Sequence, residues 1–263
     1  MPIEPTIRLT DEQIHFYHEN GYLVLDQIST PDELENLRQI YDRLFSERAG
    51  REKGDQFDLA GADEEGETAK LPQILGPSQY APEMLETLAW ANGGAIMAQL
   101  WGQEGAGRGD HAILKPARYG SPTPWHQDEA YWDPALDYTS LSIWMPLQDV
   151  DAASGCMHFV PGSHKSEIHP HRPIGNDPRV HGLELDPAFN LDLSGAVGAP
   201  LRAGGCTIHH QRTLHYAPGN VSDIPRRAWI MMGGLPATPR EKPADYYWQK
   251  QRHTAREERA KKS

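Results

Sequence analysis

The chain has 263 residues and a formal net charge of −12, from 37 acidic and 25 basic side chains. This negative balance argues against nucleic acid or an anionic membrane as a partner, and favours a small molecule. Two cysteines are too few for a disulfide framework, and residues 1–6 lack the basic start and apolar core of a signal peptide, so we expect a cytoplasmic protein. The most apolar stretch, residues 88–101, is too short and too polar for a membrane span.

Three helices and one strand are predicted in the first part of the chain. Thr10 begins a capping-box pattern that predicts a helix ending at Gly21, and residues 22–25 follow as a strand. A second helix is expected from Pro31 through Leu44, because proline favours the first turn and the apolar residues fall on one face. Pro82 starts a third helix, predicted over 83–100.

The second part of the chain predicts strands. Short apolar or aromatic runs are separated by Gly, Pro, Ser or Asp, which is the spacing of a jelly roll and differs from alternating strands and helices. These runs are residues 111–117, 124–130, 139–148, 156–160, 206–210 and 226–234. The predicted fold is therefore mainly β with flanking helices.

We expect a single domain over residues 1–263. Its predicted parts are a helical brace (10–101), a jelly-roll core (111–235), a lid insertion (163–201) and a C-terminal extension (236–263). The acidic run 55–67 is interpreted as a solvated, mobile loop. In the extension, Tyr246 to Trp248 either dock on the barrel or support a dimer, while the charged end is expected to fray.

A metal site is predicted around Trp125-His126-Gln127-Asp128. In an extended backbone, one intervening residue places the side chains of His126 and Asp128 on the same side. His215 is the expected third ligand, since two histidines and one carboxylate form the open-faced set of non-haem Fe(II) oxygenases. The competing interpretation of His126 and Asp128 is a surface hydrogen-bonded pair.

Other histidines are less suited to that third position. His209 and His210 face opposite ways in an alternating strand, so at most one of them faces the pocket, and His210 is the alternative ligand to His215. His169 and His171 repeat the His-x-His pattern, but no carboxylate is placed to complete a site there.

Arg226 is predicted to anchor an anionic co-substrate. A turn at residues 218–220 lets the chain leave His215 and return on the next strand, so that one arginine faces the pocket. Its planar guanidinium suits the distal carboxylate of 2-oxoglutarate, whereas Arg227 should point the opposite way. The alternative role of Arg226 is a structural ion pair on the barrel rim.

Taken together, these segments resemble the phytanoyl-CoA dioxygenase family of Fe(II)- and 2-oxoglutarate-dependent oxygenases. The resemblance covers about residues 10–235 and is carried by three ordered blocks, 125–128, 155–165 and 215–228. It implies a double-stranded β-helix (cupin-like jelly roll), Fe(II) bound by His126, Asp128 and His215, and 2-oxoglutarate held by Arg226.

The resemblance also implies further co-substrate contacts. Lys70, His111, Gln127 and Trp144 fall where family members place residues near 2-oxoglutarate. Lys70 has an equally good interpretation as a solvated side chain. With Fe(II), 2-oxoglutarate and O₂, the expected reaction is hydroxylation, or another oxidation, of an unactivated C–H bond in a small molecule, which releases succinate and CO₂.

Two other functions are open to such a sequence. A cupin that binds a small molecule or metal without oxidising anything would consume no O₂ with Fe(II) and 2-oxoglutarate. A zinc-dependent hydrolase would need a general base beside the metal-bound water, and no such residue stands out.

Overall fold

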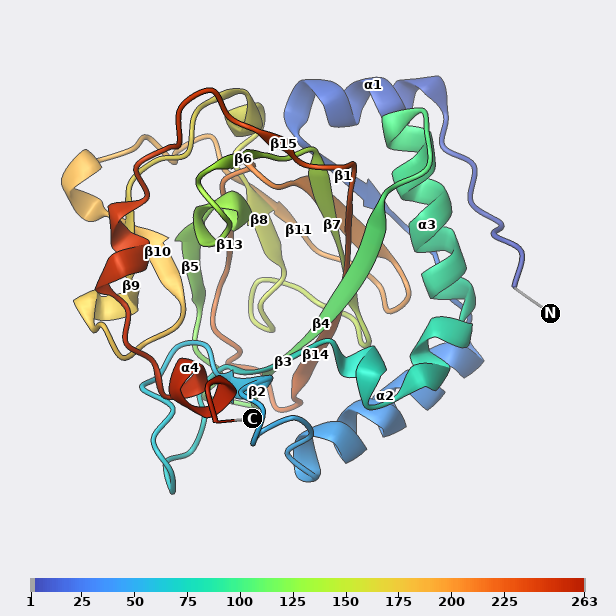
Figure 1. The fold of residues 1–263 in the computed structure, drawn as a ribbon. Helices are drawn as coiled ribbons and strands as arrows, with labels where there is room; N and C mark the ends of the chain where they lie inside the picture. The colour runs from blue at the N-terminus through green and yellow to red at the C-terminus, as the bar shows by residue number, and fades with distance from the viewer. Residues whose placement is uncertain (1–2, 263) are drawn as a thin grey trace.

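The barrel is made of two antiparallel sheets that enclose the region of the predicted site (Figure 1). The fold is described for residues 3–262 of a computed structural model. The seven-stranded major sheet has the order β1 (Tyr22–Leu25), β12 (Cys206–His210), β7 (Ser140–Pro146), β14 (Arg226–Gly234), β4 (Gly107–Lys115), β3 (Pro72–Leu75) and β2 (Gln56–Asp58). The four-stranded minor sheet has the order β11 (Val197–Ala199), β8 (Met157–Phe159), β13 (His215–Ala217) and β5 (Thr123–His126).

Three helices cover the outer face of the major sheet, on the right of Figure 1: α1 (Asp11–Asn20), α2 (Pro31–Ser46) and α3 (Leu88–Trp101). Their buried residues pack on alternate residues of the strands, such as Ile143 of β7 and Trp229 of β14. The intervening residues, such as Trp144 and Ile230, join a second cluster with Phe159 of the minor sheet. Strand alternation therefore separates a helix-facing core from the barrel interior.

Most predicted elements are confirmed, but the third helix is not continuous. Thr10 and Thr30 form capping boxes that start α1 and α2, and α1 ends at Gly21 with a φ of 76°. The third predicted helix is broken at Thr87, which is extended with φ −116° and ψ 152°. Its side chain caps α3, while the residues before it form the short 3-10 helix η2 (Pro82–Glu86).

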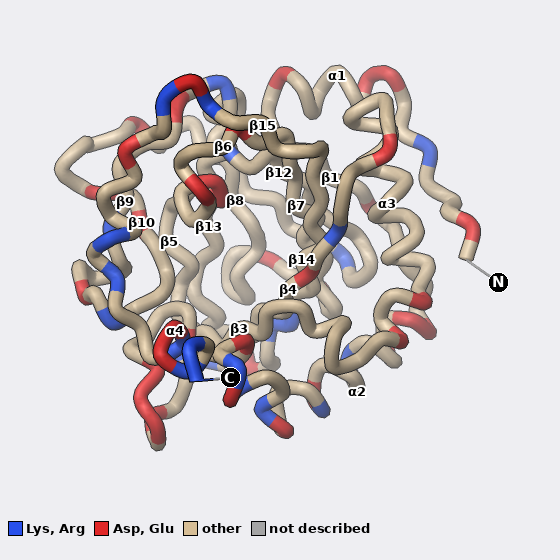
Figure 2. Tube along the Cα trace, viewed as in Figure 1, with Lys and Arg blue, Asp and Glu red and all other residues tan. Residues whose placement is uncertain are grey.

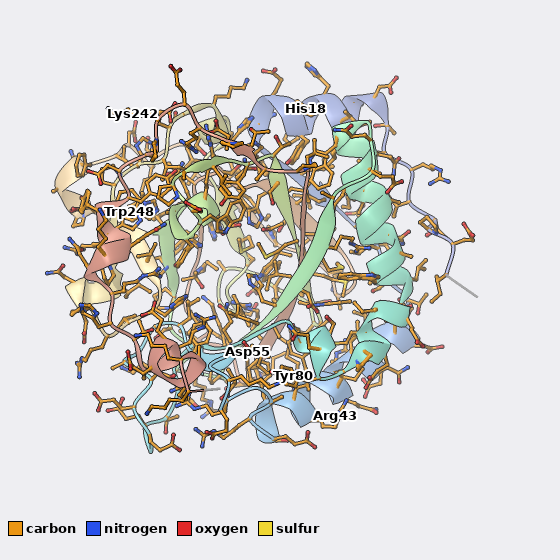
Figure 3. All side chains as sticks on the ribbon, in the orientation of Figure 1. His18, Arg43, Asp55, Tyr80, Lys242 and Trp248 are labelled. Atoms are coloured by element: carbon orange, nitrogen blue, oxygen red, sulfur yellow. The ribbon has the colours of Figure 1, made fainter. Side chains whose placement is uncertain are left out.

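The acidic segment is more ordered than the sequence suggested. It contains β2, whose residues are buried, and Asp63 accepts hydrogen bonds from Arg51 and Arg259. The Tyr80 hydroxyl, 2.6 Å from Oδ2 of Asp55, ties the start of this segment to the chain before α3 (Figure 3). The prediction of a solvated loop was wrong for this part of the run.

The segment after Ser163 is partly built into the barrel. It begins with η4 (Ser163–Lys165), and β9 (His171–Pro173) pairs with β10 (Leu183–Leu185) in a separate two-stranded sheet. Short helices η5 (Ile174–Asn176) and η6 (Pro187–Phe189) follow β9 and β10. β11, at the end of the predicted insertion, pairs with β8 of the minor sheet. The role of this segment as a lid stays a prediction.

The C-terminal segment docks on the barrel, so the prediction that its end frays was wrong. It includes β15 (Thr238–Pro239), which pairs with β6 (Leu136–Asp137), then η7 (Tyr247–Gln251) and α4 (Ala255–Ala260). Trp248 is 2% exposed and donates to the carbonyl of Ala130 (Figure 3). In Figure 2 the acidic loop that follows β2 lies beside the basic residues around α4, where Arg259 pairs with Asp63. No helix within residues 3–262 is long and apolar enough to cross a membrane.

Candidate metal and co-substrate site

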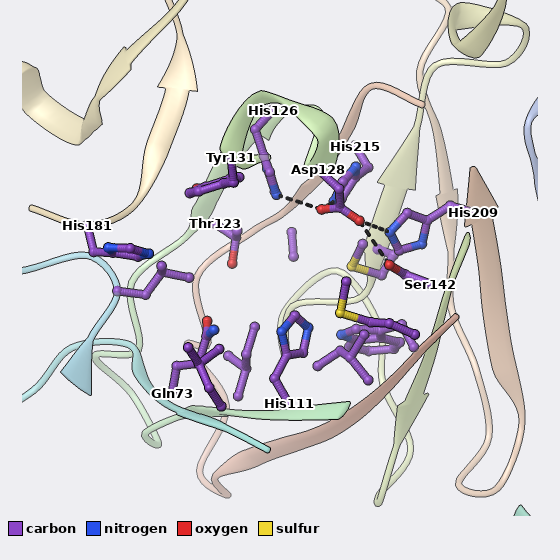
Figure 4. Close-up of a pocket in the computed structure, with 18 of the residues that line it drawn as sticks. Gln73, His111, Thr123, His126, Asp128, Tyr131, Ser142, His181, His209 and His215 are labelled. Atoms are coloured by element: carbon purple, nitrogen blue, oxygen red, sulfur yellow. Dashed lines mark hydrogen bonds and ion pairs between the residues drawn. The ribbon is translucent and has the colours of Figure 1, made fainter. Parts of the chain in front are cut away.

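His126, Asp128 and His215 come together at one end of a cavity inside the barrel (Figure 4). His126 is the last residue of β5, and Asp128 is the first residue of the short helix η3 (Asp128–Tyr131). β5 is shorter than predicted, but Gln127 keeps an extended backbone (φ −124°, ψ 133°), so the alternation still brings both side chains to one side. His215 starts β13 and is the direct register partner of His126.

The ligand atoms of these three residues lie close enough to hold one metal ion. One atom from each residue falls within 4.8 Å of the others. Asp128 Oδ1 is 3.7 Å from Nε2 of His126 and 3.5 Å from Nε2 of His215. All three residues are largely shielded from solvent: the side chain of Asp128 is 19% exposed and those of the two histidines less.

Both histidines are oriented by hydrogen bonds to the backbone. Nδ1 of His126 is 2.8 Å from the carbonyl of Pro124, and Nδ1 of His215 is 2.9 Å from the carbonyl of Thr213. Because a carbonyl only accepts, each Nδ1 carries the proton and each Nε2 presents a lone pair toward Asp128. This orientation of the second nitrogen is the usual support of a metal-binding histidine.

The electrostatics of the cluster favour neutral imidazoles and an ionised carboxylate. Burial lowers the pKa of His126 below its ordinary value, and burial together with the neighbouring imidazoles lowers the pKa of His215 further. Burial opposes ionisation of Asp128, but His215 and the hydrogen bond from His209 outweigh it and hold its pKa well below the usual range. Neutral imidazole and carboxylate are the forms that bind a metal ion.

The cavity has a volume of about 240 Å³ and a largely apolar lining. Figure 4 places the three ligands at one end, with His111 and Gln73 across the space and His181 to the side. The remaining lining residues come from both sheets and their loops: Leu59, Leu75, Ile113, Thr123, Tyr131, Trp132, Ser142, Trp144, Met157, His209, Ala217, Arg226, Ile230 and Met232.

Arg226 faces this cavity as a buried cation with free donors. Arg226 is 1% exposed, and its Nε and Nη1 have no hydrogen-bond partner among the described residues. The guanidinium carbon lies 5.3 Å from the ring centre of Trp144. Burial lowers the pKa of Arg226 to about 9, which reflects the cost of a charge that no carboxylate compensates. Arg227 points the other way, as predicted, and pairs with Asp42 of α2.

A second buried cation, Lys115, lies near Arg226. Its Nζ donates to the carbonyls of Ala217, at 2.9 Å, and Pro218, at 2.6 Å. Burial and the nearby Arg226 hold the pKa of Lys115 well below its usual value. Lys115 therefore fixes the backbone at the end of β13 and at the residue that follows. It lies in an ordinary strand pattern, and nothing in that pattern indicated this role.

The other predicted co-substrate residues divide into two groups. Trp144 and His111 line the cavity, and burial lowers the pKa of His111 to about 4. Gln127 and Lys70 do not line it. The Gln127 amide turns away from the ligands, donating to the carbonyls of Glu167 and Arg212 and accepting from the backbone of His169. Lys70 is exposed.

His209 and Ser142 contact the cluster but were not predicted as site residues. Nε2 of His209 is 3.3 Å from Oδ2 of Asp128, and the Ser142 hydroxyl is 2.9 Å from the same oxygen. His210, the alternative ligand, instead lies beside His164, and its Nδ1 accepts from the backbone of Arg212. Strand alternation indicated that only one of the two adjacent histidines faces the pocket, but not which one.

Next to Asp128, the side chain of Glu129 links η3 to the turn before His215 and to the C-terminal segment. This residue is 0% exposed, and its carboxylate binds Arg212 through two hydrogen bonds of 2.7 and 3.0 Å. Nη2 of Arg240 is 2.6 Å from Oε1 of Glu129, and the Tyr246 hydroxyl is 3.4 Å from the same atom. The short helix η3, which carries Asp128 and Glu129, is therefore bound to the turn before His215 and to the C-terminal segment.

Comparison with known proteins gives a family match over most of the chain. Residues 17–228 match the family model described as phytanoyl-CoA dioxygenase. A curated relative from Stutzerimonas stutzeri, named a probable alpha-ketoglutarate-dependent hypophosphite dioxygenase, is 27% identical over 234 residues, which is 84% of this chain and 77% of the relative.

Solved structures agree with this match. EvdO2 from Micromonospora carbonacea var. aurantiaca is 38% identical, with a TM-score of 0.81 over 94% of this chain and 99% of EvdO2. Its complex with 2-oxoglutarate has a TM-score of 0.79 and 34% identity over the same shares. The epimerase SnoN, solved with Fe³⁺, alpha-ketoglutarate and nogalamycin RO, is 24% identical with a TM-score of 0.64 over 88% of this chain and 85% of SnoN, and supports the fold.

Proposed function

Because the chain belongs to the phytanoyl-CoA dioxygenase family, whose members are Fe(II)- and 2-oxoglutarate-dependent dioxygenases, we propose that it hydroxylates, or otherwise oxidises, an unactivated C–H bond of a small molecule. His126, Asp128 and His215 bind Fe(II), and Arg226 binds 2-oxoglutarate. The observation that carries the proposal is a histidine–aspartate–histidine cluster in the same cavity as a buried, unpaired guanidinium.

The three ligands fit Fe(II) by type and orientation. Two imidazole nitrogens and one carboxylate oxygen converge from one side, which leaves the other side open for a co-substrate and O₂. Both histidines are oriented by backbone carbonyls at Nδ1, so that Nε2 is the nitrogen that each would present to the ion.

The surroundings of Arg226 fit a carboxylate. A guanidinium buried without a partner is costly, and an anion that accepts its free N–H groups removes that cost. Trp144 forms a wall beside the guanidinium, and His111 lines the same space as a neutral imidazole. We propose these two residues as further contacts of 2-oxoglutarate. Gln127 and Lys70 are not part of the proposed site.

When bound, Fe(II) with 2-oxoglutarate and O₂ supplies the oxidation, which releases succinate and CO₂. The protein orients the ligands, neutralises the co-substrate with Arg226 and excludes water with apolar lining such as Leu75, Ile113 and Met157. Halogenation would need a coordination position for a halide where the carboxylate of Asp128 binds. The presence of Asp128 therefore favours hydroxylation over halogenation.

The substrate is proposed to be a small organic molecule. Within the described residues, Arg226 is the one lysine or arginine that lines the cavity. If that cation binds 2-oxoglutarate, no other lysine or arginine of the lining remains for the phosphates of a coenzyme A ester. The family name therefore does not assign a fatty-acyl-CoA substrate to this chain.

The test is an anaerobic titration of the apo-protein with Fe(II) and 2-oxoglutarate, followed by the visible metal-to-ligand charge-transfer band of the chelate. We expect the band in the wild type and its loss in His215→Ala. Absence of the band at saturating iron, or its survival in His215→Ala, overturns the site. A protein that forms the band but releases no succinate with any of a broad panel of small molecules supports the alternative, a non-catalytic cupin-like binding protein.

A further inference from the structure

Asp128 is held by two side chains that come from the opposite sheet. Ser142 of β7 and His209 of β12 are direct register partners in the major sheet, so their side chains lie next to each other on one face. Both reach Oδ2 of Asp128 (Figure 4). The two histidine ligands, in contrast, lie on strands of the minor sheet.

The two oxygens of Asp128 consequently have different surroundings. Oδ1 faces Nε2 of His126 and His215, whereas Oδ2 is engaged by the hydroxyl and the imidazole of the major sheet. A rotation that brought both oxygens to a metal would break the hydrogen bonds at Oδ2. The geometry thus favours binding through one oxygen only.

The direction of the contact between His209 and Asp128 follows from its geometry. Nδ1 of His209 is buried and has no hydrogen-bond partner among the described residues, while its Nε2 lies next to a carboxylate oxygen. A carboxylate oxygen accepts, so the hydrogen bond is donated by Nε2 of His209. His209 therefore acts as a donor to the carboxylate and does not offer this nitrogen to a metal.

We infer that Ser142 and His209 are positioning residues that hold Asp128 as a monodentate ligand. This inference rests on the proposed metal site. Engaging Oδ2 leaves free the coordination position that a chelating carboxylate would occupy, and so keeps space for co-substrate and O₂. The residues that set this geometry lie across the barrel from the strands that carry the histidine ligands.

The test uses Co(II) as the probe, with its affinity measured by calorimetry and its coordination followed by the visible spectrum. Ser142→Ala and His209→Leu each remove one donor and should weaken Co(II) binding about 10- to 100-fold, the usual effect of losing such support. They should also change the spectrum, because Asp128 is free to chelate. His209→Gln retains an N–H donor near the position of Nε2 and should restore both readouts.

Thr207→Val is the matched control, because Thr207 is buried on β12 with the same strand parity as His209 and its hydroxyl has no partner in the described chain. Thr207→Val should bind Co(II) as the wild type does.

Wild-type affinity and spectrum in both Ser142→Ala and His209→Leu would overturn the inference. A His209→Gln variant that binds Co(II) as weakly as His209→Leu would also overturn it. In either case, loss of Co(II) binding in His215→Ala would leave the proposed metal site standing, whereas wild-type binding by that variant would overturn both proposals. If His209→Leu fails to fold, the affinity and spectrum of Ser142→Ala test the inference.

Discussion

Replacing Glu129 by glutamine should destabilise the protein although the two side chains have almost the same size. Glu129 is fully buried and binds the guanidinium groups of Arg212 and Arg240. Glutamine keeps one acceptor oxygen but turns an NH₂ group toward these donors. Two cations with side chains only 22% and 13% exposed then lose their main counter-charge, which is a larger perturbation than the loss of one hydrogen bond.

The size of the effect follows from this burial. Removing one partner of a buried ion pair typically costs about 3–5 kcal/mol. Asp137, 53% exposed, stays 3.1 Å from Nη2 of Arg240 and offers partial compensation. We therefore expect the lower end, about 3 kcal/mol, which at roughly 2–4 °C per kcal/mol for a protein near this size lowers the melting temperature by about 6–12 °C.

Urea unfolding at neutral pH measures this free energy directly, provided that the slope against denaturant is unchanged. Glu19→Gln is the control, because Glu19 and its partner Lys165 are more than half exposed, at 56% and 52%, and that variant should keep the wild-type midpoint. A loss below about 1 kcal/mol in Glu129→Gln would show that the buried cluster contributes little, and would refute the reasoning.

Other consequences can be measured separately. Arg226→Met should weaken 2-oxoglutarate binding by at least about tenfold, since charge-assisted hydrogen bonds contribute about 1.5–3 kcal/mol; unchanged affinity in an anaerobic titration would exclude Arg226 as the anchor. Burial lowers the pKa values of His171 and His181 to about 3. Below pH 6.5 the unfolded chain therefore binds protons that the folded protein does not, and the free energy of unfolding should fall by about 2 kcal/mol per histidine from pH 7 to pH 5; a constant urea midpoint would contradict this. Trp248→Ala should cost about 3–5 kcal/mol because the ring is buried, whereas Tyr247→Ala, at a position 37% exposed, should change the thermal midpoint little.

The sequence was most informative where local patterns decide the structure. The capping box at Thr10 and the proline at position 31 marked the starts of α1 and α2, and the strands 206–210 and 226–234 were predicted with their observed bounds. Alternation along a strand also predicted that Arg226 and Arg227 would face opposite ways. Each of these features depends on a few neighbouring residues.

Features that depend on distant parts of the chain were missed. The contact of Ser142 and His209 with Asp128 arises from the register between β7 and β12, which spacing alone does not reveal. The family resemblance placed Gln127 near the co-substrate, yet the same alternation that turns His126 inward turns Gln127 away. Likewise, the C-terminal end was expected to fray because its partners, such as Asp63, lie far away in sequence.

The hydrogen bonds of Glu129 with the C-terminal segment have a consequence for folding and metal binding during synthesis. Its partners Arg240 and Tyr246 follow every strand of the two barrel sheets in the chain, so they are translated after the proposed metal ligands. During synthesis the barrel strands are available first, while the helix η3 that carries Asp128 still lacks the contacts of Glu129 with Arg240 and Tyr246. A nascent chain halted before residue 240 should therefore acquire metal less well than the complete chain.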